Sequence, residues 1–264
     1  MPEIPWNCRA FGHFALSKEV AITLDYTLRH VGDHGLCVEF ANEISLSTNQ
    51  KVCRLKASLE KKDLHGIEEC IPTYRSLLIL YDPFQITWQQ IRTAVEECVQ
   101  APDSTQRGKN LITEIPVLYE GEYAMDLEDI ARIENKTVEQ IIRIHSKSDY
   151  YVYMLGFSPG HPYTARFDDP FSFRRRPSPR LRIPGGSVVV QGEQSNITPF
   201  DQPCGWYVIG STPLRMCDYR HKNPFLLQAG QWVRYVPVDR REFLEIRRQV
   251  ELDCYVCKTL EKEV

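Results

Sequence analysis

The sequence contains no apolar run long enough to span a bilayer, and residues 1–20 lack the basic start and continuous apolar core of a signal peptide. Its net charge is only −3, from 32 basic and 35 acidic residues, so no strong field points toward nucleic acid or anionic lipid. The phosphate loop G-x-x-x-x-G-K-[ST] is also missing. These absences predict a cytoplasmic protein that binds neither nucleic acid nor membrane.

Disulfide and zinc frameworks are missing as well. The nine cysteines are odd in number and irregularly spaced, unlike a disulfide scaffold. Cys254 and Cys257 form the single close pair, and neither a second pair nor histidines at ligand spacing accompany them. We therefore expect no metal site and free thiols near the end of the chain, with a redox role as the alternative.

The composition, with 42% hydrophobic and 25% charged residues, is typical of a globular protein. The first part of the chain alternates between strand and helix patterns. Thr87 and Gln90 form a capping box that opens a helix. Before it, the pattern predicts strands at 22–28, 36–40, 68–71 and 76–81 and a helix at 45–62. This order favours a small sheet with helices on one face.

A polar linker at 102–110 separates this part from a different pattern. Residues 111–119 predict a strand, Asp126 and Thr137 are expected helix N-caps, and the helix from Val138 should end near His145. Many short apolar runs broken by Gly and Pro then extend to about residue 238, which is typical of a closed β-barrel or sandwich. The charged segment 240–263 is expected to be helical.

Two stretches rich in Pro and Gly are the most informative, Tyr153–Tyr163 and Arg180–Val190. Neither can be a helix, because Pro removes a backbone donor and Gly costs backbone entropy. Each predicts a strand joined to a rigid loop, the kind of segment that often carries a site. We expect the two loops to converge at the mouth of the barrel and to shape a pocket for a small polar molecule.

The first loop contains a hydrolase-like motif that its chemistry rules out. Residues 156–160 match the nucleophile elbow G-x-S-x-G, which uses the backbone N–H after the serine as an oxyanion donor. Here Pro159 follows Ser158 and has no N–H, so we reject a serine hydrolase. His161, within a Pro-Gly-His-Pro turn, is expected to be exposed and able to touch a ligand.

The second loop leaves two interpretations open. Pro184–Ser187 is either a tight turn or a nest of backbone amides for an anion. Arg180 and Arg182 share one face of a strand and could bind carboxylate or phosphate, whereas residues 174–176 are more typical of a solvated stretch. His145 is either a general acid–base or a structural histidine at a helix end. Gln194 and its neighbours offer neutral hydrogen-bonding groups that suit an amide or lactam ligand, but also any turn.

Longer motifs occur in order along residues 28–238. They include Ile71-Pro72-Thr73-Tyr74-Arg75-Ser76, Tyr81-Asp82-Pro83, Ile115-Pro116-Val117, Tyr153–Gly160, Pro184-Gly185-Gly186-Ser187-Val188 and Gly205-Trp206. With these motifs the chain resembles the family that includes the subunit-B protein of bacterial ATP-dependent 5-oxoprolinase, the kinase inhibitor KipI and allophanate hydrolase subunit 1. It is also similar to one half of the carboxyltransferase region of urea carboxylase.

The resemblance implies an α+β fold, with an N-terminal ferredoxin-like α/β sandwich and a C-terminal cyclophilin-like β-barrel. The implied divisions are an N-terminal extension at 1–20, the ferredoxin-like domain at 21–101, the linker at 102–110, the barrel at 111–240 and a helical tail at 241–264. The chain departs from the family pattern on the expected site loops. His161 stands where Phe is usual, Thr164 where Leu is usual, and Ser195-Asn196 where Thr-Gly is usual.

The resemblance also implies an enzyme subunit that cleaves the lactam of 5-oxoproline to glutamate. ATP with Mg²⁺ would drive the reaction, and subunit-A-like and subunit-C-like partners would complete the site. Arg180 would stabilise charge or bind a carboxylate, and His145 would transfer a proton. The expected substrate-binding residues are Gly156, Phe157, Pro159, Gly160, His161, Tyr163, Arg182, Pro184, Gly185, Gly186, Ser187 and Gln194.

Two other functions remain open from the same resemblance. One is inhibition of a sensor histidine kinase, which an exposed apolar patch with aromatics such as Phe171, Phe173 and Trp206 would support. The other is a carboxyltransferase or allophanate hydrolase subunit 1-like component that acts on urea-derived amides. That function would need a biotin-bearing partner.

Overall fold

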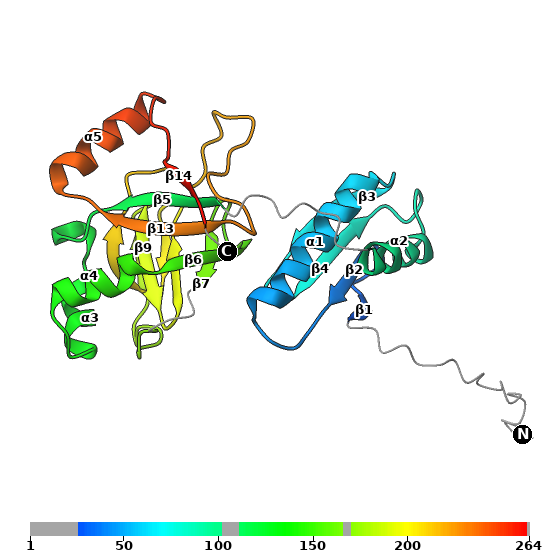
Figure 1. The fold of residues 1–264 in the computed structure, drawn as a ribbon, viewed down its shortest axis with the longest axis horizontal. Coiled ribbons are helices and arrows are strands. Elements are labelled where there is room, and N and C mark those ends of the chain that lie inside the picture. The colour runs from blue at the N-terminus through cyan, green and yellow to red at the C-terminus, as the bar shows by residue number, and fades with distance from the viewer. Residues whose placement is uncertain (1–25, 102–110, 166–169, 263–264) are drawn as a thin grey trace, which may run out of the picture.

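A computed structural model describes residues 26–101, 111–165 and 170–262 (Figure 1). We call residues 26–101 the N-terminal unit and residues 111–262 the C-terminal unit. Each has its own sheet and its own buried core. The described chain therefore has a mixed α/β fold. The names ferredoxin-like and cyclophilin-like, and the domain boundaries, stay predictions.

The N-terminal unit is an antiparallel sheet packed against two helices. Its strands lie in the order β1 (Thr27–His30), β2 (Gly35–Glu39), β4 (Ser76–Tyr81) and β3 (Ile67–Pro72). Every second residue of β4 is buried, and these residues share one core with α1 (Leu46–Lys62) and α2 (Trp88–Gln100). The alternation that predicted β4 thus marks the face under the helices. Of the predicted strand 22–28, residues 22–25 lie outside the described residues.

Side-chain caps begin the helices where the sequence predicted. Thr87 and Gln90 form both bonds of a capping box at α2, and Thr137 and Gln140 do the same at α4 (Val138–Lys147). Asp126 stands at the N-cap position of α3 (Leu127–Ile133), but its side chain makes no capping bond. Its carboxylate is bound by groups from other elements, described below.

The C-terminal unit is an eight-stranded sheet whose pairs are antiparallel except for β13–β5. Its strands run in the order β12 (Tyr207–Ser211), β9 (Ser187–Gln191), β10 (Gln194–Ile197), β7 (Pro162–Ala165), β6 (Asp149–Leu155), β13 (Trp232–Pro237), β5 (Leu111–Val117) and β14 (Thr259–Glu261). Leu118 and Ser211 exchange two backbone hydrogen bonds of 2.9 and 3.0 Å. The end of β5 therefore meets the end of β12, and the sheet closes on itself there.

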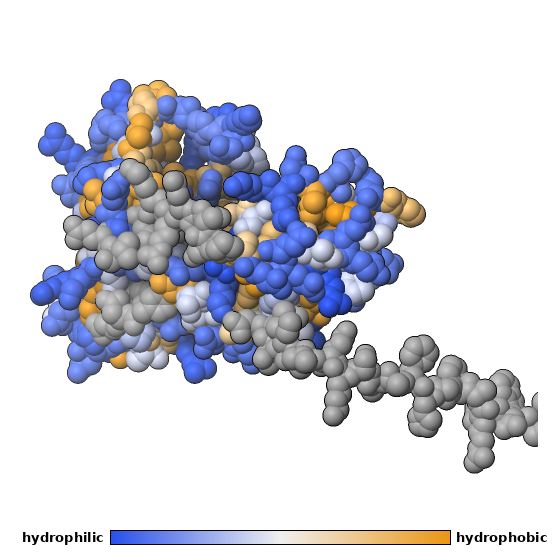
Figure 2. Space-filling view, turned by 45° about the vertical axis from the view of Figure 1, so that its right-hand side comes forward, coloured by the Kyte–Doolittle hydropathy of each residue, from blue (hydrophilic) through white to orange (hydrophobic). Residues whose placement is uncertain are grey.

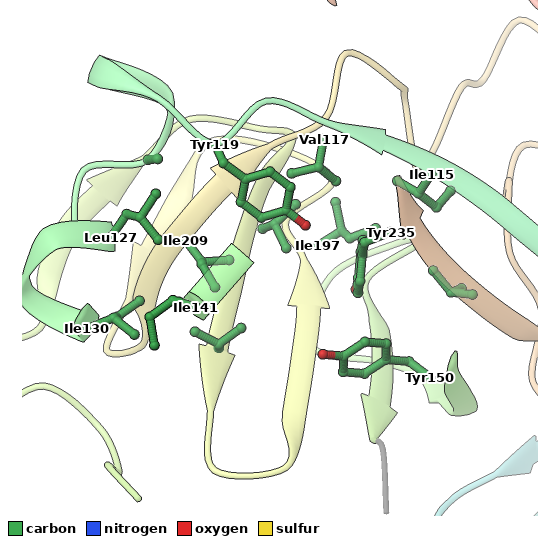
Figure 3. Close-up of a cluster of buried hydrophobic side chains, with 14 of the residues drawn as sticks. Ile115, Val117, Tyr119, Leu127, Ile130, Ile141, Tyr150, Ile197, Ile209 and Tyr235 are labelled. Atoms are coloured by element: carbon green, nitrogen blue, oxygen red, sulfur yellow. The ribbon is translucent and has the colours of Figure 1, made fainter. Parts of the chain in front are cut away.

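Apolar side chains fill the space that this closed sheet encloses together with α3 and α4 (Figure 3). Val117, Ile197 and Tyr235 from three strands pack in the same cluster as Leu127 and Ile141 from α3 and α4. A separate ribbon, β8 (Arg180–Ile183) paired with β11 (Gln202–Cys204), lies outside the eight strands. The remaining elements are the short helix η1 (Gly121–Tyr123) and α5 (Arg240–Glu251).

One expectation for this unit was wrong, and the apolar patch that would support the kinase-inhibitor alternative does not form with Phe171 and Phe173. The C-terminal segment is not helical throughout, because α5 ends at Glu251 and Thr259–Glu261 pair with β5. The open edge of β5 accepts a strand there, and Lys262 Nζ holds it by lying 3.9 Å from the Trp232 ring centroid. Phe171 and Phe173 are buried and stacked at 5.2 Å, so they form no exposed patch.

The two units meet along α1 and the turn between β3 and β4. The side-chain amide of Asn49 donates to the carbonyl oxygens of Thr73 (2.8 Å), Tyr74 (3.2 Å) and Tyr153 (3.3 Å). Gln194 Nε2 donates to the Tyr74 hydroxyl over 2.6 Å. The Tyr74 ring centroid lies 5.0 Å from that of Tyr153. These contacts set α1 and β3 opposite the loop between β6 and β7. No helix among the described residues is long and apolar enough to cross a membrane.

Candidate functional site

A cleft of about 870 Å³ lies between the two units. One wall is formed by α1 and β3, including Lys56, Glu60 and Glu69. The opposite wall is the loop at 155–160, which we call the cleft loop, and residues near Phe225 and Gln228 complete the lining. Its volume is typical of a small-molecule site. On the face in Figure 2, apolar residues form small separate groups among hydrophilic ones, so a concave site is the more distinctive feature.

The cleft loop is held in a fixed shape by its own backbone. Gly156 N donates to His161 O (3.1 Å), and His161 N donates to Ser158 O (3.0 Å). Gly160 has φ +79, and a Cβ atom there would lie 2.8 Å from the carbonyl oxygen of Met216, so only glycine fits. Phe157 has φ 67 and is 70% exposed at the rim of the cleft. The rigid loop expected from Gly and Pro is therefore present.

A buried polar cluster lies beneath the cleft loop. His161 Nε2 lies 3.4 Å from Asn196 Nδ2, and His161 Nδ1 lies 3.4 Å from Gln202 Nε2. Ser158 Oγ lies 3.0 Å from Gln202 Oε1, at the other end of the same amide. Burial lowers the pKa of His161 to about 4, which keeps the imidazole neutral near pH 7.

His161 is buried, so the expectation of an exposed histidine was wrong. Its ring packs against those of Phe157 and Tyr163, with centroid distances of 5.8 and 5.2 Å. Tyr163 in turn lies 6.2 Å from Tyr74 across the seam between the units. The residues at which the chain departs from the family pattern, His161, Thr164 and Asn196, are neighbours here, since Thr164 N donates to Asn196 Oδ1 over 3.0 Å.

The second loop, Pro184–Ser187, lies beside this cluster but outside the lining of the cleft. Gln202 pairs with Ile183, and Asp201 next to it accepts a hydrogen bond from Gly185 N at 2.8 Å. Gly186 N donates to Thr198 O (2.7 Å) and Ser187 N to Pro184 O (3.3 Å). Because protein acceptors already bind these amides, the loop is a turn and not an anion nest. The two loops do converge, joined through β11.

The predicted catalytic arginine is bound to a buried carboxylate. Arg180 Nη1 and Nη2 donate to the two oxygens of Asp126, each over 2.7 Å. This bond raises the pKa of Arg180. Arg180 pairs with Cys204, at the far end of the ribbon from Gln202, roughly 10 Å along the strand. Arg182 is exposed and paired with Asp201. Neither arginine lines the cleft.

The predicted catalytic histidine is enclosed in the core of the C-terminal unit. His145 is fully buried, with Nδ1 2.7 Å from the Tyr119 hydroxyl and Nε2 2.8 Å from Ser195 Oγ. Its ring stacks on Tyr235 at 4.4 Å. Tyr119, Tyr150 and Tyr235 gather in this part of the core (Figure 3). The geometry favours a structural part for His145 and for Arg180, and their catalytic roles stay predictions.

Sequence reasoning missed several residues of the site. Ser158 lines the cleft, and Gln202 supports it, yet neither was among the expected ligand contacts. Lys56, Glu60 and Glu69 come from ordinary helix and strand patterns about 100 residues away, with no local signal. Of the expected contacts, Gly156, Phe157, Pro159 and Gly160 line the cleft, whereas Gln194 lies at the seam between the units.

The residues that the sequence predicts for charge binding offer no free site for a magnesium–nucleotide complex. The amides of Pro184–Ser187 are occupied, and Arg180 and Arg182 are each paired with an aspartate. No group of three or more His, Cys, Asp or Glu among the described residues could hold a metal ion. We therefore derive no step through ATP on this chain.

Comparison with known proteins places the chain in a class. Residues 26–227 match the family described as carboxyltransferase domain, subdomain C and D, and the chain belongs to this family. It is 33% identical over 232 residues to the 5-oxoprolinase subunit-B protein of Bacillus subtilis (strain 168), covering 84% of this chain and 97% of that protein. It is 31% identical over 208 residues to the 5-oxoprolinase subunit-B protein of Escherichia coli O157:H7, covering 78% and 94%.

A solved structure supports the fold. The crystal structure of TTHA0988 superposes with a TM-score of 0.68 at 29% sequence identity, over 78% of this chain. The chain spans 40% of the length of that protein. The similarity therefore concerns one part of a longer molecule.

Proposed function

We propose that the chain is a subunit of an ATP-dependent 5-oxoprolinase-type amidohydrolase that cleaves the lactam of 5-oxoproline to glutamate. The observation that carries this proposal is the 33% identity to a 5-oxoprolinase subunit-B protein over 97% of its length. The ferredoxin-like and cyclophilin-like assignments of the two units, and their boundaries, belong to the same proposal.

The cleft supports a small amide as the substrate. Its volume of about 870 Å³ leaves room for such a molecule together with a partner segment or water. The exposed ring of Phe157 offers an apolar wall for ring methylenes, and Ser158 offers a neutral polar group. Lys56, whose Nζ is 2.5 Å from Glu60 Oε1, adds a cation on the opposite wall.

ATP and Mg²⁺ are assigned in this proposal to a partner. Arg180, Arg182 and the backbone amides of 185–187 are already paired within the chain. Subunit-A-like and subunit-C-like proteins would then supply the nucleotide site and exclude water from the cleft. Activity should accordingly need the mixture and not this chain alone.

Reconstitution tests the proposal. The purified chain is mixed with its subunit-A-like and subunit-C-like partners, and glutamate release from 5-oxoproline is measured with and without ATP. We expect ATP-dependent release that stops when any component is omitted. Ala57→Trp on the exposed α1 wall should block the cleft, while Thr93→Trp on the exposed side of α2 should not. No glutamate from the complete mixture would refute the proposal.

The family description favours a second candidate, a carboxyltransferase component acting on a urea-derived amide. That reaction would need a biotin-bearing partner. Carboxylation of urea that depends on such a partner, together with no release of glutamate from 5-oxoproline, would select it. The kinase-inhibitor alternative loses its expected apolar patch, since Phe171 and Phe173 are buried and Trp206 is partly buried.

A further inference from the structure

In the polar cluster beneath the cleft loop, each hydrogen-bonding atom can be assigned as a donor or an acceptor. The backbone N–H of Thr164 can only donate, and it lies 3.0 Å from Asn196 Oδ1. The Asn196 oxygen is therefore fixed toward Thr164, and its NH₂ group faces His161 Nε2 at 3.4 Å. Because an amide NH₂ group can only donate, His161 Nε2 must carry the lone pair.

The state of the other ring nitrogen follows. His161 is neutral near pH 7, and a neutral imidazole carries one N–H. With Nε2 unprotonated, this N–H lies on Nδ1, which faces the terminal amide of Gln202 at 3.4 Å. The structure sets Gln202 Nε2 toward this nitrogen. The two ends of a glutamine amide have the same shape, so the hydrogen bonds decide which end faces which neighbour. A donor on Nδ1 requires the Gln202 oxygen to face it.

The orientation of the Gln202 amide also decides its hydrogen bond with Ser158, which lines the cleft. In the structure Ser158 Oγ lies 3.0 Å from Gln202 Oε1 and donates to it. When the Gln202 amide is reversed so that its oxygen faces His161, its NH₂ group takes the place of that oxygen and faces Ser158 Oγ. Ser158 Oγ thus accepts a hydrogen bond from Gln202 and keeps its own proton. Among the described residues, Gln202 is the one hydrogen-bond partner of Ser158 Oγ, and Ser158 lines the cleft.

We propose that Ser158 donates its hydroxyl proton to a carbonyl or carboxylate oxygen of a ligand in the cleft, and that Asn196, His161 and Gln202 are positioning residues that fix this direction. The neighbouring backbone does not compete for that oxygen, since Ser158 N already donates to Gly156 O (2.8 Å) and Pro159 has no N–H. A lactam belongs to this ligand class. The inference rests on the proposed function for the identity of the ligand but not for the direction of the hydroxyl.

A spectroscopic test needs no ligand. The ¹⁵N chemical shifts of the His161 ring in the full chain, assigned by comparison with His161→Gln, report which nitrogen is protonated. We expect a protonated Nδ1 and an unprotonated Nε2 at pH 7. The opposite tautomer would overturn the proposal, because Gln202 would then offer its NH₂ to His161 and its oxygen to Ser158.

A binding test uses 2-pyrrolidinone and L-5-oxoproline as probes, with L-proline as the analogue that lacks the ring carbonyl, titrated into the full chain and followed by NMR. Ser158→Ala should weaken binding of 2-pyrrolidinone about tenfold, the loss of one hydrogen bond. Ser158→Thr should retain the affinity, and Ser47→Ala, on the exposed side of α1, should not change it. Equal affinity of wild type and Ser158→Ala, or no binding of either lactam to the wild type, would overturn the proposal.

The variant Gln202→Glu tests whether Gln202 acts by orienting the Ser158 hydroxyl or only by filling space. A carboxylate at this position can only accept, so it would take the proton of Ser158 as well as that of His161 Nδ1. We expect affinity to fall as it does in Ser158→Ala, with no further loss in the double variant. Wild-type affinity in Gln202→Glu would contradict the proposal. Failure of glutamate release in the reconstituted mixture would remove the proposed function alone, since the tautomer and the pyrrolidinone affinities are measured without it.

Discussion

Arg180 and Asp126 form a bidentate ion pair that joins the ribbon β8–β11 to the start of α3, with both N–O distances at 2.7 Å. The Asp126 side chain is fully buried and also accepts hydrogen bonds from Arg176 and from Val208 N, the latter at 2.7 Å. Several donors therefore surround one buried negative charge. Removing one partner of such a pair is strongly destabilising, because it leaves a buried charge without its counter-ion.

Arg180→Ala should lower the free energy of unfolding by about 3 kcal/mol, because it leaves a buried carboxylate short of its main partner. Urea denaturation of the isolated chain measures this. Arg182→Ala is the matched control, since its pair with Asp201 is exposed to solvent and the loss of that pair should change stability little. A catalytic role for Arg180 would instead appear as lost turnover in Arg180→Lys under conditions where that variant is fully folded.

Asn49 is the second position where one side chain serves several elements. It is fully buried, and its amide donates to three carbonyl oxygens, two near the β3–β4 turn and one in β6. Asn49→Leu should lower the free energy of unfolding by about 2 kcal/mol, because buried carbonyls lose their donor. It should also increase hydrogen exchange along β6 near Tyr153. Gln50→Ala, at the next and exposed position of α1, should do neither, and an unchanged Asn49→Leu would show that the seam does not depend on this residue.

The features predicted well from the sequence depend on residues close together in the chain. The capping boxes at Thr87 and Thr137 span four residues each, and β4 needs six alternating ones, so local spacing was enough. The strand Thr259–Glu261 is too short for any period, and it forms because β5 has an open edge. Such tertiary causes leave no local signal.

In the candidate site, too, the features set by neighbouring residues were predicted and those set by distant residues were not. The rigid shape of the cleft loop follows from its own Gly and Pro, and it was predicted. The burial of His161 depends on Asn196 and Gln202, which are 35 and 41 positions away. The partner of Arg180 is 54 positions away, so its guanidinium could not be assigned to Asp126 from spacing. The family resemblance identified the family of the chain, but it did not predict these side-chain pairings.

His161 should make stability depend on pH in a defined window. Its pKa is about 4 in the folded chain against 6.5 for the free side chain, so between these values the unfolded state binds more protons. The contribution of neutral His161 to the free energy of unfolding is complete above pH 6.5 and is lost as the pH falls to about 4. At about 1.4 kcal/mol for each pKa unit, it amounts to roughly 3 kcal/mol. Urea denaturation of wild type and His161→Gln across pH 4–7 isolates it as the difference between the two curves. Parallel curves would mean that His161 titrates alike in both states.

Gly210 lies where the two ends of the eight-stranded sheet meet. It precedes Ser211, whose backbone bonds to Leu118 join β12 to β5, and a Cβ atom at Gly210 would lie 2.6 Å from Val117 Cγ1 and 2.9 Å from Leu118 O. Gly210→Ala should therefore separate the two strand ends and lower the free energy of unfolding by about 1–3 kcal/mol. Gly205→Ala is the control, because its nearest neighbour would be at 3.8 Å, an ordinary contact. Thermal denaturation and the exchange rates of the Leu118 and Ser211 amides report the effect. If both variants melted together with the wild type, the strand ends could part without cost and closure would not contribute to stability.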